Sequence, residues 1–188
     1  MMREFFDLVG FVVTEPLKIA FKIVDEAVES VDKVIDAPLK LFNEPKDIRP
    51  SFGTPVFTEI GFGISGHSGI YIGNDKIIAL NARGEIIENT FEEFTSHITT
   101  FNYEICIPYD NKHDWEIGFA DAGVRAIDKL GQSRNYHVLF DNSHQFISGC
   151  LTGDFENSCN FLWMLKDEVQ RRYGDQVVWR KWDWKQYK

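Results

Sequence analysis

The spacing of apolar residues changes along the chain, from helical at the start to strand-like after residue 51. In the first 46 residues, apolar side chains recur every three or four positions, which predicts a helix with one apolar face. They are Leu17, Ala20, Phe21, Val24, Ala27, Val28, Val31, Val34 and Ile35. The pattern predicts a helical arm over residues 1–46 that packs on the following domain or pairs with a second copy. Peripheral contact with a membrane is the alternative, which the acidic polar face of this helix disfavours.

Residues 51–178 show the alternating pattern of one α+β domain, an antiparallel sheet packed against helices. The runs 67–73 and 76–82 flank Asn74-Asp75, a dipeptide typical of a tight hairpin turn. Two more strands are predicted at "RGEIIE" and "YEICIPY", and a short helix with an Asn or Thr cap at "NTFEEFTSH". Longer helices are predicted over residues 114–131, from Ser143 to about Leu151, and over residues 160–174. The first of these would have Asp114 as its cap and Gly131 as its stop.

After the predicted domain, residues 179–188 form a separate Trp- and Lys-rich tail. Its sequence, "RKWDWKQYK" after Trp179, places three of the five tryptophans beside Arg and Lys. Aromatic side chains next to cations are found at membrane interfaces, at partner surfaces and in cation–π pairs. A tail folded over an apolar groove explains the same composition.

The net charge of −9 and the pI of about 5.0 narrow the classes of partner. A nucleic-acid-binding protein would need a basic face, so no nucleic-acid partner is expected. The three cysteines lack metal spacing and no dinucleotide motif is present, so we expect neither a metal nor a cofactor. The first residues lack the features of a signal peptide. We therefore expect a cytoplasmic protein, with peripheral membrane attachment through residues 1–46 as the alternative.

Two places carry candidate chemistry. His67 precedes an apolar strand and has the small neighbours Gly66, Ser68 and Gly69, which predicts an accessible imidazole and a general base. Ser143 opens a helix, where free amide groups and the helix dipole stabilise negative charge and would lower a thiol pKa. Taken alone, however, the histidine suits a half-buried position and the serine suits a helix N-cap.

The motifs "GHSGIYIGNDKII", "EIIENTFEEF" and "YHVLFDNSHQFISGCLTG", in this order, resemble the lecithin–retinol acyltransferase-like family. This family is the circularly permuted branch of the NlpC-type, papain-like superfamily. The resemblance covers roughly residues 55–153 and implies a permuted papain-like fold. It leaves out the arm and the tail.

By this resemblance, His67 matches the general base of the family and Ser143 stands where the family carries its nucleophilic cysteine. Cys150 matches a second, structural cysteine. Relatives also carry a second histidine where this chain has Ala79, and Asn81, two residues on, is the candidate for orienting His67. His144 follows the nucleophile position directly and is expected to be structural.

The resemblance implies a thiol-dependent hydrolase or acyltransferase that forms an acyl-enzyme from an ester, thioester or amide. Its substrates would be acyl-bearing lipids or peptides. Ser143 is interpreted first as an engineered Cys-to-Ser substitution, then as a natural inactive form, and last as a working serine nucleophile. The alternatives are an inactive binding module for an acyl chain or peptide, and a cysteine peptidase or toxin-like effector.

Overall fold

The computed structural model describes residues 48–60, 65–96, 104–134, 142–174 and 176–187. The predicted arm over residues 1–46 lies outside this part of the chain. The described elements are β1 (Pro55–Ile60), β2 (Ser65–Gly73), β3 (Lys76–Leu80), β4 (Ile86–Asn89), α4 (Phe91–Thr95), β5 (Ile105–Asp110), β6 (Trp115–Glu116), α5 (Ala120–Asp128), α6 (Ser143–Thr152), α7 (Leu162–Tyr173), β7 (Val177–Trp182) and the 3-10 helix η1 (Trp184–Tyr187).

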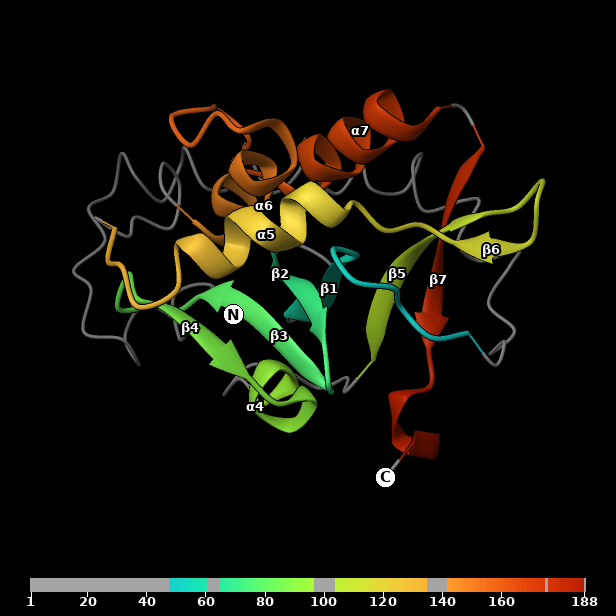
Figure 1. The fold of residues 1–188 in the computed structure, drawn as a ribbon, viewed down its shortest axis with the longest axis horizontal. Helices are drawn as coiled ribbons and strands as arrows, with labels where there is room; N and C mark the ends of the chain where they lie inside the picture. Colours follow the sequence, from blue (N-terminus) through green and yellow to red (C-terminus); the bar gives the residue numbers. More distant parts are fainter. Residues whose placement is uncertain (1–47, 61–64, 97–103, 135–141, 175, 188) are drawn as a thin grey trace, which may run out of the picture.

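The strands of the described residues form one antiparallel sheet. Its order is β4-β3-β2-β1-β5-β6, and β7 pairs with β5 as well. Helices α5, α6 and α7 lie on one side of this sheet, and α4 lies on the other (Figure 1). The predicted class, α+β with an antiparallel sheet packed against helices, is therefore confirmed. Strand β1, which lies between β2 and β5, was not among the predicted strands.

The predicted hairpin between β2 and β3 is confirmed, and its turn has the expected backbone. Asn74 and Asp75 both adopt positive φ angles, 50° and 59°. This left-handed pair matches the right-handed twist of the flanking strands, and Asn and Asp tolerate it better than most residues. The turn therefore fixes which residues of β2 and β3 face each other: Ile70 is opposite Ile78, and Tyr71 is opposite Ile77.

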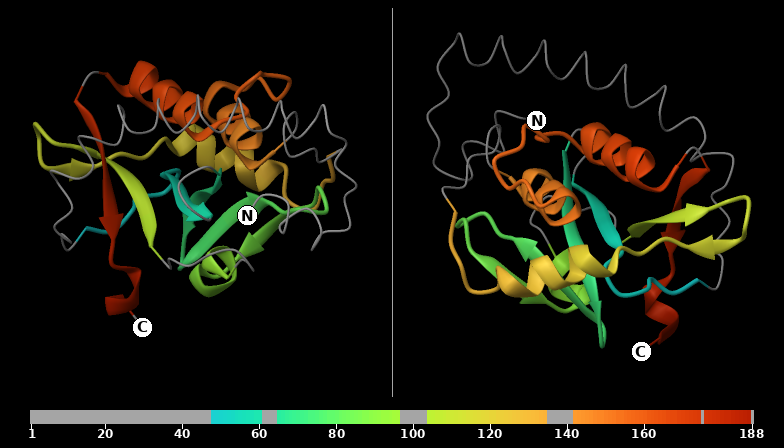
Figure 2. Two further views of the ribbon diagram at one scale, coloured as in Figure 1. Left: turned by 180° about the vertical axis from the view of Figure 1, so that it is seen from behind. Right: turned by 45° about the horizontal axis from the view of Figure 1, so that its top comes forward.

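The sheet has an apolar core on each face, because alternate residues of a strand point to opposite sides. Phe57, Ile70 and Ile78 belong to the core shared with α5, α6 and α7. Their neighbours Val56 and Ile77 belong to the core shared with α4. We call these two sides the α6 face and the α4 face. The right-hand view of Figure 2 shows α5, α6 and α7 together above the α6 face.

Two predicted boundaries are wrong. The helix predicted over residues 114–131 is shorter: Trp115–Glu116 is β6, paired with the end of β5, and α5 covers Ala120–Asp128. Asp114 has a positive φ of 64° and cannot begin a helix there. The helix-like apolar spacing around Trp115 arises because Ile117 and Phe119 enter the core from an extended segment.

The segment 179–188 is not a separate tail in the part that the structure describes. Residues Trp179–Trp182 belong to β7, which pairs with β5 along its whole length, and η1 follows. Trp179, Trp182 and Trp184 are buried, so these three rings serve the core and not a membrane interface. Within the described residues, no helix combines the length and the apolar character that crossing a membrane requires.

Candidate functional site

Helix α6 begins where the sequence predicts it, but its cap is a different residue. Asn142 is the N-cap, and its Oδ1 accepts hydrogen bonds from the N–H groups of His144 (3.0 Å) and Gln145 (3.3 Å). The Asn142 Nδ2 donates to the carbonyl of Asn160 at 2.7 Å. The interpretation of Ser143 as a helix cap is therefore wrong: Ser143 is the first residue of the helix, and its side chain is left for another contact.

The Ser143 hydroxyl contacts β2. The main-chain N–H of Ser68 donates to Ser143 Oγ at 3.3 Å. Ser68 Oγ in turn lies 3.0 Å from His144 Nδ1, within hydrogen-bond distance. All three residues are buried. The two candidate motifs thus meet where Ser68 contacts Ser143, 75 residues further along the chain.

His67 lies on the other face of the sheet. A Cβ on Gly66 would lie 3.5 Å from His144 Cε1, and one on Gly69 would lie 3.0 Å from the Phe94 ring. Gly66 and Ser68 therefore face α6, whereas His67 and Gly69 face α4. The His67 ring lies 4.8 Å, centroid to centroid, from the ring of Phe94. The structure does not bring the imidazole of His67 beside the hydroxyl of Ser143.

His67 is also less accessible than its small neighbours suggested. It is 7% exposed, because α4 covers the strand on that side. The predicted accessible imidazole is therefore not found in this structure.

Asn81 is used within the turn that joins β3 to β4. Its Oδ1 accepts from the N–H groups of Arg83 (2.8 Å) and Glu85 (2.9 Å), and its Nδ2 donates to Glu85 Oε2 at 2.8 Å. These bonds use the amide locally and stabilise the turn, as Asn side chains often do. Ala79, at the position of the second family histidine, is buried in the core of the α4 face.

Burial sets the protonation of the groups around Ser143. Desolvation, together with the smaller effect of the nearby charge of Lys166, lowers the pKa of His144 to about 4, so His144 is neutral near pH 7. Lys166, on α7, is itself buried and lies 5.0 Å from the centroid of the Phe57 ring. The expectation that His144 is structural agrees with its burial and its contact with Ser68.

Cys150 and Cys159 are buried thiols. Desolvation raises the pKa of each to about 12, so neither is a thiolate at neutral pH. Cys106, on β5, is buried as well. A protonated, buried Cys150 is a poor replacement for Ser143 as a nucleophile.

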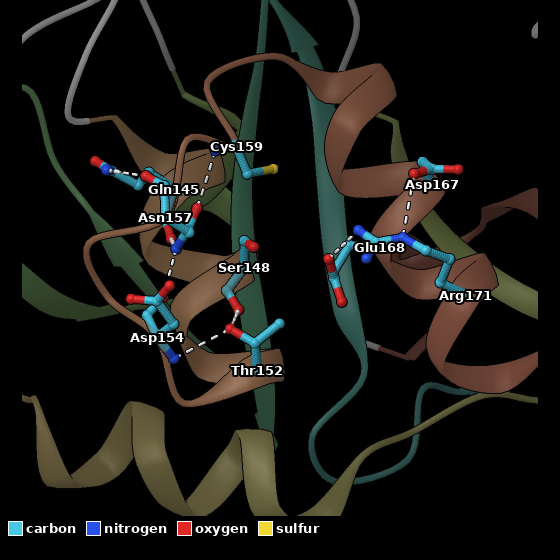
Figure 3. A network of polar contacts seen from close by, with 9 residues as sticks. All are labelled: Gln145, Ser148, Thr152, Asp154, Asn157, Cys159, Asp167, Glu168 and Arg171. Carbon is cyan, nitrogen blue, oxygen red and sulfur yellow. Dashed lines mark hydrogen bonds and ion pairs between the residues drawn. The ribbon is translucent and has the colours of Figure 1, made fainter.

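The rest of α6 is fastened to the loop that follows it (Figure 3). Asn157 Nδ2 donates to the Gln145 carbonyl at 3.0 Å, and Gln145 Nε2 donates to the Asn157 carbonyl. Asn157 Oδ1 accepts from the Cys159 N–H at 3.0 Å. Near the other end, Thr152 Oγ1 bonds the Ser148 carbonyl at 2.8 Å. The contacts between Gln145 and Asn157 thus tie the first turn of α6 to the loop that follows the helix.

The arrangement holds residue 143 at a helix N-terminus with a backbone donor beside it, but it does not pair that residue with His67. Within the described residues, His, Cys, Asp and Glu side chains form no group of three or more that could hold a metal ion. No protein-family model and no curated protein matches this chain. The family resemblance therefore stays a prediction.

The position of Ser68 was detectable in the sequence. In "HSGIYIG" the residues Ser68, Ile70 and Ile72 alternate with His67, Gly69 and Tyr71. Strand alternation alone thus groups Ser68 with the large apolar residues Ile70 and Ile72, and separates it from His67. The sequence pattern does not predict which of these two faces α6 covers.

Proposed function

We propose that this chain is the scaffold of a thiol hydrolase or acyltransferase with a serine at its nucleophile position, in a permuted papain-like fold. In this form it would hold an acyl-bearing substrate and turn it over poorly or not at all. The observation that carries the proposal is the contact between Ser68 N–H and Ser143 Oγ, which joins the two family-like motifs in space.

The chemistry of the proposed active form follows from a thiol at position 143. The thiolate would attack the carbonyl carbon of an ester, thioester or amide, and the alcohol, thiol or amine would leave with a proton. The resulting thioester would pass its acyl group to water or to an acceptor, which restores the thiol. A serine has no comparable anionic fraction near neutral pH, and His67, on the opposite face, is not placed to take its proton.

The test compares the chain as given with the Ser143→Cys variant. Both are exposed to a short acyl thioester and to an electrophilic thiol probe, and adducts are located by intact-mass measurement and peptide mapping. The buried native cysteines, with pKa values of about 12 for Cys150 and Cys159, serve as an internal control for folding. An acyl adduct at position 143 that turns over supports the proposal, and a folded variant without such an adduct rejects it.

The histidine is tested in the same background. His67→Ala added to Ser143→Cys should leave the reaction rate within about twofold if the side chain stays on the α4 face. A loss of about a hundredfold or more would mean that His67 reaches residue 143 during the reaction, as the family resemblance implies.

A second candidate is a binding module without turnover, which the surface of α5 favours. Val124 and Ile127 on this helix are 52% and 44% exposed, and Phe52, which packs on Gly123, is partly exposed beside them. Exposed apolar side chains that gather on one helix often mark a binding surface. The test is titration of a fluorescent long-chain acyl probe into the chain as given and into Val124→Ser and Ile127→Ser variants. Saturable binding that both variants weaken supports this candidate, and equal binding rejects it.

A further inference from the structure

Ser68 makes two contacts that no other residue of β2 combines in the described part of the chain. Its main-chain N–H donates to Ser143 Oγ at 3.3 Å, and its own Oγ lies 3.0 Å from His144 Nδ1. Ser68 therefore links the side chain at position 143 to the histidine that follows it. All three groups are shielded from water, so none of these contacts competes with bulk solvent.

We infer that Ser68 is a positioning residue for the side chain at position 143, and that His144 holds Ser68 in place. This inference rests on the proposed function, because it assigns a role to Ser68 only if position 143 carries the nucleophile. In this arrangement the main-chain N–H of Ser68, and not a histidine side chain, contacts the side chain at position 143. The buried contact between Ser68 and His144 holds this part of β2 in place.

The physical reason is the shortage of other donors near position 143. The N–H groups of His144 and Gln145 are already bonded to Asn142 Oδ1 and cannot turn to a thiolate without breaking the cap. The Ser68 N–H points at the side-chain atom of residue 143 from the neighbouring strand. A hydrogen bond donated to a sulfur anion favours the anion and lowers the thiol pKa.

Other charged groups around α6 also affect the pKa of a thiol at position 143. Lys166 approaches from α7, and its positive charge also favours an anion nearby. Arg125, on α5, bonds the carbonyls of Cys150 and Leu151 at the far end of α6. His67 faces the opposite side of the sheet. Burial opposes all of these effects, and at Cys150, two turns along the same helix, it raises the thiol pKa to about 12.

The experiment measures the pKa of the thiol introduced by Ser143→Cys, from the pH dependence of thiolate ultraviolet absorbance. In this background, Ser68→Ala and His144→Phe each remove one side of the Ser68–His144 contact. His144→Asn keeps a polar atom within reach of Ser68 and is the rescue variant. Thr58→Val removes a buried hydroxyl from β1, opposite His67 on the α4 face, and is the matched control.

We expect the introduced thiol to have a pKa below the ordinary value of about 8.5, in contrast to Cys150. Ser68→Ala and His144→Phe should each raise this pKa by about one unit, and His144→Asn should restore at least half of the shift. Thr58→Val should leave it unchanged. Circular dichroism confirms that each variant is folded, and the two variants test the same contact from opposite sides.

An introduced thiol with a pKa above about 8.5, or one unaffected by both Ser68→Ala and His144→Phe, overturns the inference. This outcome differs from failure of the proposed function. A lowered thiol pKa that depends on Ser68, without any acyl adduct at position 143, keeps the positioning role and rejects the hydrolase or acyltransferase.

Discussion

His144 should make the stability of this protein depend on pH in a window set by its burial. The folded-state pKa of His144 is about 4, against 6.5 for an unperturbed histidine. Between about pH 4 and pH 6.5, His144 is largely protonated in the unfolded chain and largely neutral in the folded chain. Stability is therefore fully present above about pH 6.5 and falls as the pH is lowered towards about pH 4.

The magnitude follows from the same two values. Each pKa unit corresponds to about 1.4 kcal/mol, so the complete shift is worth about 3 kcal/mol below about pH 4. Between about pH 7 and about pH 5, the protein should lose about 2 kcal/mol of its free energy of unfolding through His144 alone. This is a large fraction of the 5–15 kcal/mol or so that holds a typical domain folded.

The assay is urea unfolding at several pH values between about 7 and 5, followed by circular dichroism, for the chain as given and for His144→Asn. The variant removes the titrating group and keeps a polar partner for Ser68. Acidic groups such as Asp121, whose pKa is lowered chiefly by its hydrogen bond to Arg172, contribute equally to both proteins. The difference between the two pH slopes therefore isolates His144, and identical slopes would refute the assignment of a buried, neutral His144.

Three further predictions concern the same region. Asn142→Ala should lower the free energy of unfolding by about 2 kcal/mol, because three hydrogen bonds of a buried cap are lost. Asn142→Asp keeps the acceptor and should lower it less. If urea titrations show a loss below about 0.5 kcal/mol for Asn142→Ala, the prediction is contradicted. Gly69→Ala should lower the free energy of unfolding by about 1–3 kcal/mol, since the added Cβ would lie 2.3 Å from Ile77 Cγ2 and 3.1 Å from the Ile78 carbonyl oxygen. Val124→Ala, at an exposed position, is the control and should change the free energy of unfolding by no more than about 0.5 kcal/mol. Cys150 and Cys159 should resist alkylation in the folded chain and react after unfolding, and rapid labelling of either in the native state would disagree with their burial.

Local signals in the sequence predicted most of the elements around the site. The Asn-Asp turn, the Thr90 capping box of α4 and the start of α6 at Ser143 all depend on residues within a few positions of one another. Such signals act through backbone preference and short-range hydrogen bonds, so they need no knowledge of distant contacts. The helix predicted over 114–131 is too long because Ile117 and Phe119 enter the core from an extended segment, and Trp179 and Trp182, in the region predicted as a tail, enter it from β7.

The partners of the candidate residues, by contrast, were decided by tertiary structure. The sequence alone placed His67 on a strand and Ser143 at the start of a helix, and strand alternation already separated His67 from Ser68. Only the packing of α6 on the Ser68 side and of α4 on the His67 side determined which residue Ser143 meets. A strand offers both faces equally to a covering helix, and the choice depends on contacts between segments far apart in the chain, which no local pattern records.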